Sequence, residues 1–192
     1  METELSERQK EIINASLELI AESGIQSLTI KNLSKKIGLV ESAIYRHYES
    51  KTQILIAILD SITEGAKPND LTGDESVICF LEKRLENHFL TFTNNPALVS
   101  VVFAEDLFQN EPLLIEKTKV KVEKSISELA KLISVGQQKG EIRNDIVSEQ
   151  ISIMINGSVR MLVKQWKMSG YSFDLIIKGA ELIHSLKLML KL

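Results

Sequence analysis

Apolar residues recur at three- and four-residue intervals along nearly the whole chain, and this helical periodicity restricts the fold more than any other feature. The alternating β-branched runs that mark strands are nearly missing. The 192 residues include only 3 prolines and 9 glycines, which argues against a collagen-like, linker-rich or disordered chain. We therefore expect an all-α protein of about nine helices.

Capping and helix-breaking residues give the expected helix boundaries. Ser6 and Gln9 stand at capping-box spacing, and Gly24 and Gly38 suit the left-handed position that follows a helix. We also expect the segment 136–140, which begins and ends with glycine, to separate two helices. The expected helices span about 6–22, 29–37, 40–47, 50–62, 74–93, 97–109, 112–136, 147–169 and 173–191.

Residues 29–51, with the sequence TIKNLSKKIGLVESAIYRHYESK, carry the strongest functional signal. Two short helices separated by a turn that contains Gly38 form a helix-turn-helix pattern. This segment holds five basic and two acidic residues, a net charge of +3, whereas residues 1–22 hold two basic and six acidic residues, a net charge of −4. The whole chain carries −3, so positive charge is concentrated where a nucleic-acid backbone would lie.

The second helix of this pattern combines small residues at its start with an aromatic and basic stretch at its end. Ser42 and Ala43 are small enough to let the helix enter a major groove about 12 Å wide. We expect the stretch from Tyr45 to Tyr48 to face outward. Tyrosine hydroxyls there, and the ammonium of Lys51, would bind phosphates and fix the register of the protein on DNA.

Residues 6–55 resemble the DNA-binding domain of the TetR family of bacterial transcriptional regulators. The residues that carry the resemblance are the approach from Gly24 to Thr29, the stretch from Leu33 to Gly38, the run Ala43-Ile44-Tyr45-Arg46-His47-Tyr48, and Ser50-Lys51. The resemblance implies a three-helix DNA-binding domain over residues 1–52. It also implies a larger helical effector-binding and dimerisation domain over residues 53–192.

The resemblance further implies roles for single residues. Thr29 would cap the first motif helix and contact phosphate, and Lys31 would reach a base edge or a phosphate. Three residues at the leading end of the recognition helix would face bases: Glu41, Ser42 and Ala43. The expected DNA-binding set also includes residues at the end of the recognition helix and just after it. Tyr45, His47 and Lys51 would contact phosphates, and Arg46 completes the set.

Two positions depart from the common pattern of the family. Val40 stands where a capping serine is frequent, so the recognition helix would begin without its usual side-chain cap. Glu41 stands where a basic or amide residue is common. A glutamate accepts a hydrogen bond from cytosine N4 but repels phosphate, so the pattern leaves the operator sequence open.

The expected helices at 147–169 and 173–191 are apolar over much of their circumference. This apolar surface is larger than one small domain leaves exposed, and the same helices of a second copy would bury it. In the resembled family these two helices dimerise. We therefore expect a homodimer that presents two recognition helices roughly 34 Å apart, one turn of DNA.

Five of the six phenylalanines fall within residues 80–108, between the motif and these two helices. The simpler interpretation is an apolar core. The alternative, which the resemblance implies, is an inducer cavity that is mostly apolar with a few polar groups. The candidate effector-binding residues are His88, Phe89, Phe92, Phe103, Phe108 and Trp166.

Together these features predict a repressor that is released from a palindromic operator by a small apolar effector. One alternative is a helical enzyme, for which the sequence shows no nucleophile–base pair, phosphate loop or metal cluster. Another is a helical protein-interaction or small-molecule-binding protein without DNA binding. We expect no catalytic activity, no cofactor and no metal site.

The single cysteine, Cys79, excludes an internal disulfide framework, and its apolar neighbours predict a buried thiol. The charged N-terminal residues 1–10 contain no apolar signal-peptide region. The longest uncharged run, 87–104, contains His, Asn and Pro and would be costly in lipid. We therefore expect a cytoplasmic protein with no membrane partner.

Overall fold

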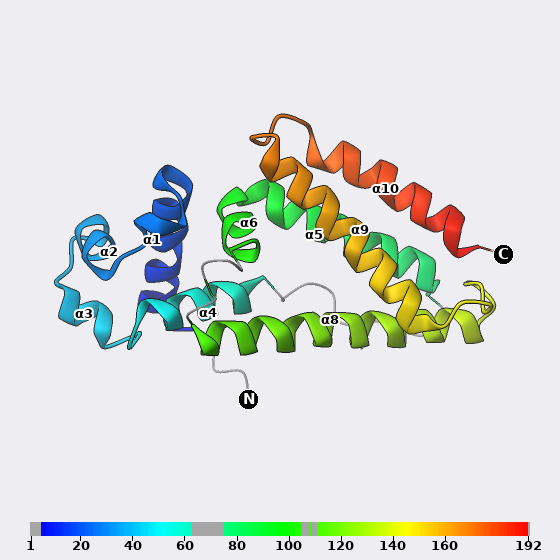
Figure 1. Ribbon diagram of the computed structural model, residues 1–192, viewed down its shortest axis with the longest axis horizontal. Helices are drawn as coiled ribbons and strands as arrows, with labels where there is room; N and C mark the ends of the chain where they lie inside the picture. The colour runs from blue at the N-terminus through cyan, green and yellow to red at the C-terminus, as the bar shows by residue number, and fades with distance from the viewer. Residues whose placement is uncertain (1–4, 63–74, 105–107, 109–110, 192) are drawn as a thin grey trace. The chain divides into compact units, whose positions relative to one another are not determined.

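The computed structural model describes residues 5–62, 75–104, 108 and 111–191. All regular structure in these residues is helical, which confirms the expected all-α class (Figure 1). The helices are α1 (Glu7–Ser23), the short 3-10 helix η1 (Ile25–Ser27), α2 (Ile30–Ile37), α3 (Glu41–Tyr45), α4 (Lys51–Ser61), α5 (Val77–Asn94), α6 (Pro96–Val102), α8 (Pro112–Gln138), α9 (Ser148–Met168) and α10 (Leu175–Leu190).

The helices group into two compact units. Unit 1 holds the described residues of 1–63 and 95–118, and so includes α1 to α4 and α6. Unit 2 holds the described residues of 64–94 and 119–192, and so includes α5, α9 and α10. These units are defined by packing, and the functional division after residue 52 stays a prediction.

Unit 1 is built on apolar residues that its helices turn inward. Helix α1 begins with the expected capping box, in which Ser6 Oγ accepts from Gln9 N at 3.3 Å and Gln9 Oε1 accepts from Ser6 N at 2.9 Å. Helix α6 packs against α1 and α4. Seven core side chains of α1 to α4 and of the segment between η1 and α2 are at most 2% exposed: Ile12, Ile20, Leu28, Leu33, Ile44, Ile54 and Ile58. This shared core sets the angle between α2 and α3.

Unit 2 packs α10 against both α5 and α9. A Cβ atom at Gly179 of α10 would lie 2.5 Å from Cδ2 of Phe89, so the two helices approach closely only because this residue is glycine. Helix α9 is joined to α8 by Ser152 Oγ, which donates to the carbonyl oxygen of Ile126 at 2.7 Å. None of the helices in the described ranges is both long enough and apolar enough to cross a lipid bilayer.

Three sequence-based expectations about this fold are wrong. The helix expected over 97–109 ends at Val102 in α6, and residues 105–107 and 109–110 lie outside the described ranges. Gly136 lies inside α8 and does not end it. A Cβ atom there would stand 2.6 Å from Ile142 Cδ1, so the glycine allows close packing at this point of the helix. Cys79 is exposed, since its neighbours Ile78 and Phe80 take the inward positions of α5.

Replacing Gly179 by alanine tests the close approach of α10 to α5. The added methyl group overlaps the Phe89 ring, so we expect Gly179→Ala to lower the free energy of unfolding by about 1–3 kcal/mol in a urea titration. Combining it with Phe89→Leu should restore part of that loss by making room. A Gly179→Ala variant as stable as the wild type would contradict this packing.

Candidate nucleic-acid interface

Helix α2 has defined signals at both ends. Thr29 Oγ1 accepts a hydrogen bond from Asn32 N at 3.1 Å, so Thr29 caps the helix. Gly38 ends it in the left-handed conformation, with φ 74° and ψ 28°. Leu39 N then donates to the carbonyl oxygen of Ser34 at 2.9 Å. The capped helix α2 and the tight turn after it lead directly into α3.

Helix α3 is anchored by one residue. Ile44 is fully buried, whereas Glu41, Ser42 and Tyr45 are exposed and Ala43 is half-buried. The residues expected to face DNA bases therefore lie on the outside of unit 1, opposite the anchor.

Tyr48 departs from the rest of the aromatic stretch, and the expectation that it faces outward is wrong. It is 5% exposed, whereas Tyr45 is 49% exposed. Helix α3 ends at Tyr45 and the chain turns inward, with Tyr48 N donating to the carbonyl oxygen of Ile44 at 3.1 Å. The Tyr48 hydroxyl is buried without a hydrogen-bond partner among the described residues, and burial raises its pKa.

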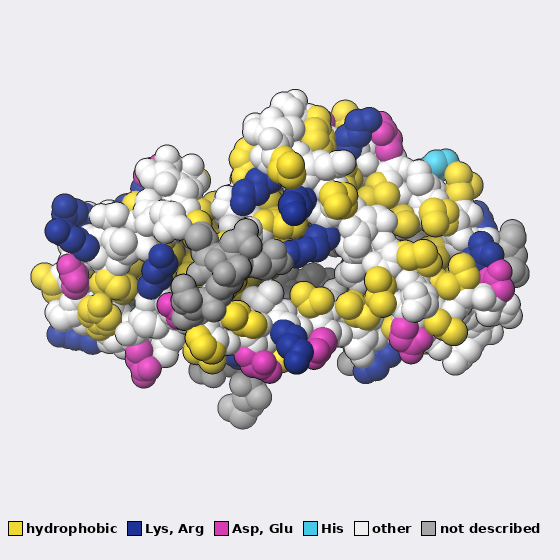
Figure 2. All heavy atoms as spheres, in the orientation of Figure 1, with side chains coloured by type: hydrophobic (Ala, Val, Ile, Leu, Met, Phe, Trp, Pro, Cys, Tyr) yellow, Lys and Arg dark blue, Asp and Glu magenta, His cyan; other side chains and the backbone are white. Residues whose placement is uncertain are grey.

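The five basic residues of the motif fall into two groups. Lys36 lies against α1, with Nζ 2.9 Å from Glu22 Oε1 and 3.1 Å from Glu18 Oε2, and these carboxylates raise its pKa. In the described part of the chain no ion pair engages the other four: Lys31, Lys35, Arg46 and Lys51. Figure 2 shows Lys and Arg side chains on the surface where α2 and α3 lie. These four cations remain available to an external anion.

Lys51 is placed by the start of α4. Ser50 Oγ accepts from Gln53 N at 3.2 Å, and Gln53 Oε1 accepts from Glu49 N at 2.9 Å. The Ser50 cap fixes Lys51 as the first residue of α4, half-buried next to the turn that follows α3, while the Gln53 side chain binds the residue before the cap and does not complete a capping box. His47, in that turn, is also half-buried.

The residues expected to bind an effector are divided between the two units. Phe103 and Phe108 belong to unit 1, and the other four belong to unit 2: His88, Phe89, Phe92 and Trp166. On α5 the His88 ring makes edge contacts with the Phe89 ring at a centroid distance of 6.4 Å and with the Phe92 ring at 4.8 Å. Their assignment to an effector stays a prediction.

Trp166 closes the turn between α9 and α10. Its Nε1 donates to the carbonyl oxygen of Phe173 at 2.9 Å, and its ring meets that of Tyr171 edge-on at 4.7 Å. Gly170 and Tyr171 both adopt positive φ angles, 67° and 62°. The tryptophan thus stabilises a strained turn at some distance along the chain from the α5 aromatic residues.

Sequence reasoning missed Arg84, which lies one helical turn before His88 on α5. Its Nη2 is 3.8 Å from Glu128 Oε2, and its Nη1 is buried without a partner in the described residues. Burial, followed by the charge of Arg84, lowers the pKa of His88 to about 4. An arginine and a histidine four residues apart, and so on one face of the expected helix, were the available signal.

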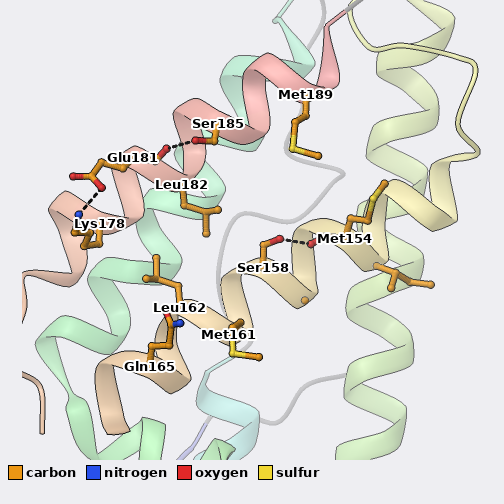
Figure 3. Close-up of a pocket in the computed structure, with 12 residues that line it drawn as sticks. Met154, Ser158, Met161, Leu162, Gln165, Lys178, Glu181, Leu182, Ser185 and Met189 are labelled. Atoms are coloured by element: carbon orange, nitrogen blue, oxygen red, sulfur yellow. Dashed lines mark hydrogen bonds and ion pairs between the residues drawn. The ribbon is translucent and has the colours of Figure 1, made fainter. Parts of the chain in front are cut away.

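Helices α9 and α10 leave an open groove of about 740 Å³ between them, and side chains of both helices point into it (Figure 3). Several apolar side chains there are exposed, with Ile153 at 49% and both Met161 and Met189 at 57%. The groove is lined by Ile153, Met154, Gly157, Ser158, Met161, Leu162, Gln165, Lys178, Glu181, Leu182, Ser185 and Met189. Within the described ranges, the groove included, no three His, Cys, Asp or Glu side chains gather as a metal site would require.

Comparison with known proteins identifies the family of this chain. Residues 12–58 match the family model described as "Bacterial regulatory proteins, tetR family", and residues 55–190 match the model "YsiA-like protein, C-terminal region". The chain belongs to the TetR family. Membership confirms the predicted function, a DNA-binding transcriptional regulator that dimerises and responds to a small molecule.

Individual relatives resemble this TetR-family chain over most of its length. The "Fatty acid metabolism regulator protein" of Bacillus subtilis (strain 168) is 25% identical over 174 residues, which cover 86% of this chain and 87% of that protein. The fatty acid degradation regulator FadR from Bacillus halodurans has a TM-score of 0.79 at 22% identity, covering 96% of this chain and 97% of that one.

A further solved structure is that of the transcriptional regulator FadR from Bacillus subtilis in complex with stearoyl-CoA. It has a TM-score of 0.74 at 22% identity and covers 94% of this chain and 98% of that one. At this identity the likeness shows the fold alone, and that fold extends through both units of the TetR-family chain.

Two tyrosine variants of this TetR-family protein separate the core from the interface. Tyr48→Phe removes a buried hydroxyl without a partner, so the free energy of unfolding should rise by about 1 kcal/mol while DNA affinity is unchanged. The matched control Tyr45→Phe alters an exposed hydroxyl, so stability should stay within about 0.5 kcal/mol while DNA affinity falls. Urea unfolding and fluorescence anisotropy measure the two effects. A Tyr48→Phe variant less stable than the wild type would show that the hydroxyl is satisfied.

Proposed function

We propose that this TetR-family protein represses transcription as a homodimer on a palindromic operator and that a long-chain acyl compound releases it. The observation that carries the DNA-binding part is the set of four motif cations that no ion pair in the described residues engages. Two copies of such a set would contact the phosphates of successive major grooves.

On DNA, the exposed side of α3 reads bases and the residues around it hold phosphates. Glu41, Ser42 and Ala43 face base edges, with Glu41 accepting from cytosine N4 where the operator offers it. The phosphate-binding set is Thr29, Lys31, Tyr45, Arg46, His47 and Lys51. Exposure of Lys31, Tyr45 and Arg46 supports these roles, because such side chains reach a backbone without rearrangement of the core.

The second copy binds along α9 and α10. The exposed apolar side chains of the groove support this, because a monomer would leave them in water. Gly157 has open space at its Cβ position, so a helix of the partner can approach closely there. The methionines adapt their shape to an opposing surface. Pairing of these two helices with their symmetry mates forms a four-helix interface.

The effector class rests on relatives. The first is named a fatty acid metabolism regulator, and the FadR structure from Bacillus subtilis contains stearoyl-CoA. The chain matches the C-terminal family model over residues 55–190, the part in which an effector would bind. We therefore take a long-chain fatty acid or its CoA thioester as the effector, which shifts the protein toward states that do not fit the operator.

The domain division and the setting follow from the same proposal. Residues 1–52 bind DNA, and residues 53–192 bind the effector and the second copy; the two family models overlap at 55–58, which supports a division near this point. The relatives named above are regulators, which supports a role without catalysis. A repressor acts where chromosomal DNA lies, so we place the protein in the cytoplasm.

The salt dependence of DNA binding tests the assignment of cations. Lys51→Ala removes one phosphate contact per subunit, so the slope of log affinity against log salt should become shallower by about 0.9 per contact, about 1.8 per dimer. The matched control Lys36→Ala removes a cation already paired with α1 and should leave the slope unchanged. Fluorescence anisotropy on a labelled duplex measures both. Equal slopes for Lys51→Ala and the wild type would contradict the phosphate contact.

A further inference from the structure

We propose that Arg84 and His88 of α5 form the polar anchor of the effector site and bind an anionic oxygen of the ligand. This inference rests on the proposed function and names residues for the ligand that function requires. The shared chemistry is an anionic oxygen on a long acyl compound, either the carboxylate of a fatty acid or a phosphate of an acyl-CoA.

Arg84 is a cation whose hydrogen-bonding capacity is not used up within the described residues. Its side chain is 21% exposed, and Nη1 is fully buried without a partner there. Burying an unpaired guanidinium N–H is costly unless something satisfies it. The rest of the side chain stays partly exposed to solvent.

The carboxylate nearest to Arg84 is a weak and shared partner. Arg84 from α5 and Lys124 from α8 share a single carboxylate, Glu128, and each lies 3.8 Å from one of its oxygens. At 3.8 Å neither contact is a hydrogen bond. Glu128 is therefore only a distant partner of Arg84, and the buried Nη1 is left for a further anionic oxygen.

His88 adds a second hydrogen-bonding group one turn along the same face. Burial and the charge of Arg84 lower its pKa to about 4, so the ring is neutral near pH 7 and carries one N–H donor. Its contact with the Phe92 ring at 4.8 Å holds it in place. An anion bound to Arg84 would cancel the charge that opposes protonation of His88.

The residues that follow on α5 suit the rest of an acyl ligand. Phe89 and Phe92 are 1% and 3% exposed and flank the His88 ring. A few convergent polar groups beside apolar side chains are the usual composition of a small-molecule site. The head group would therefore meet Arg84 and His88, while the chain would displace or extend along the aromatic side chains.

Calorimetric titration of the full-length protein with oleate and with stearoyl-CoA tests the anchor. Arg84→Met keeps the length of the side chain but removes its charge, and we expect at least about a tenfold loss of affinity for the ligand that binds. The matched control Lys83→Met alters an adjacent cation that is 66% exposed and pairs with Glu75, and its affinity should be unchanged.

Two readouts separate a binding role from a structural one. Because Nη1 lacks a partner, Arg84→Met should be as stable as the wild type or more stable. In the wild type, ligand saturation should raise the pKa of His88 by at least about one unit in an NMR titration, with the signal assigned by His88→Gln. A destabilised Arg84→Met together with an unmoved His88 pKa would overturn the inference.

The two ligands show whether the anion is a carboxylate or a phosphate. They also show whether a negative result concerns the anchor alone or the proposed effector class as well. Binding of oleate alone identifies a carboxylate, and binding of stearoyl-CoA alone identifies the CoA thioester; either supports the anchor if Arg84→Met weakens it. Equal binding by the wild type and Arg84→Met overturns the anchor but leaves the proposed function standing. Binding of neither ligand overturns the proposed effector class and the anchor with it.

Discussion

Burial of Ile44 is the interaction on which the DNA-binding side of the molecule depends. Helix α3 has only five residues, too few to be helical by itself in water. Its N-cap residue, Val40, provides no side-chain cap. The helix forms because Ile44 is fully buried in the core that α1, α2 and α4 build, and because the left-handed turn at Gly38 delivers the chain at the required angle. Every exposed residue of α3 takes its direction from that one buried side chain.

The polar groups of each unit are of two kinds, those with a partner in the protein and those without one. In unit 1 the carboxylates of α1 hold Lys36, while the remaining motif cations lack such partners in the described residues. In unit 2 Trp166 finds the carbonyl of Phe173, whereas Nη1 of Arg84 finds none there. Satisfied groups fix the fold, whereas the unpaired motif cations and Nη1 of Arg84 are the groups through which we propose that DNA and ligand bind.

Local signals were sufficient to predict the elements, and long-range packing accounts for what they missed. The capping box at Ser6 and the left-handed Gly38 act within a few residues, so the sequence predicts those helix ends. Gly136 has the same local signature as a helix breaker, but its reason lies in the contact with Ile142, which only the folded chain shows. Tyr48 belongs to the same aromatic stretch as Tyr45 and differs only because the helix ends between them. Sequence patterns do not single out Arg84, because only the three-dimensional structure shows that its Nη1 lacks a partner in the described residues.

The spacing of DNA half-sites tests most directly whether two copies of this motif act together. Selection of bound duplexes from random DNA by the purified dimer, followed by footprinting, measures that spacing. We expect an inverted repeat whose half-sites are centred about 10–10.5 base pairs, or a multiple of that distance, apart. Enrichment of a single unpaired half-site, or no enrichment at low ionic strength, would contradict the dimeric DNA-binding function.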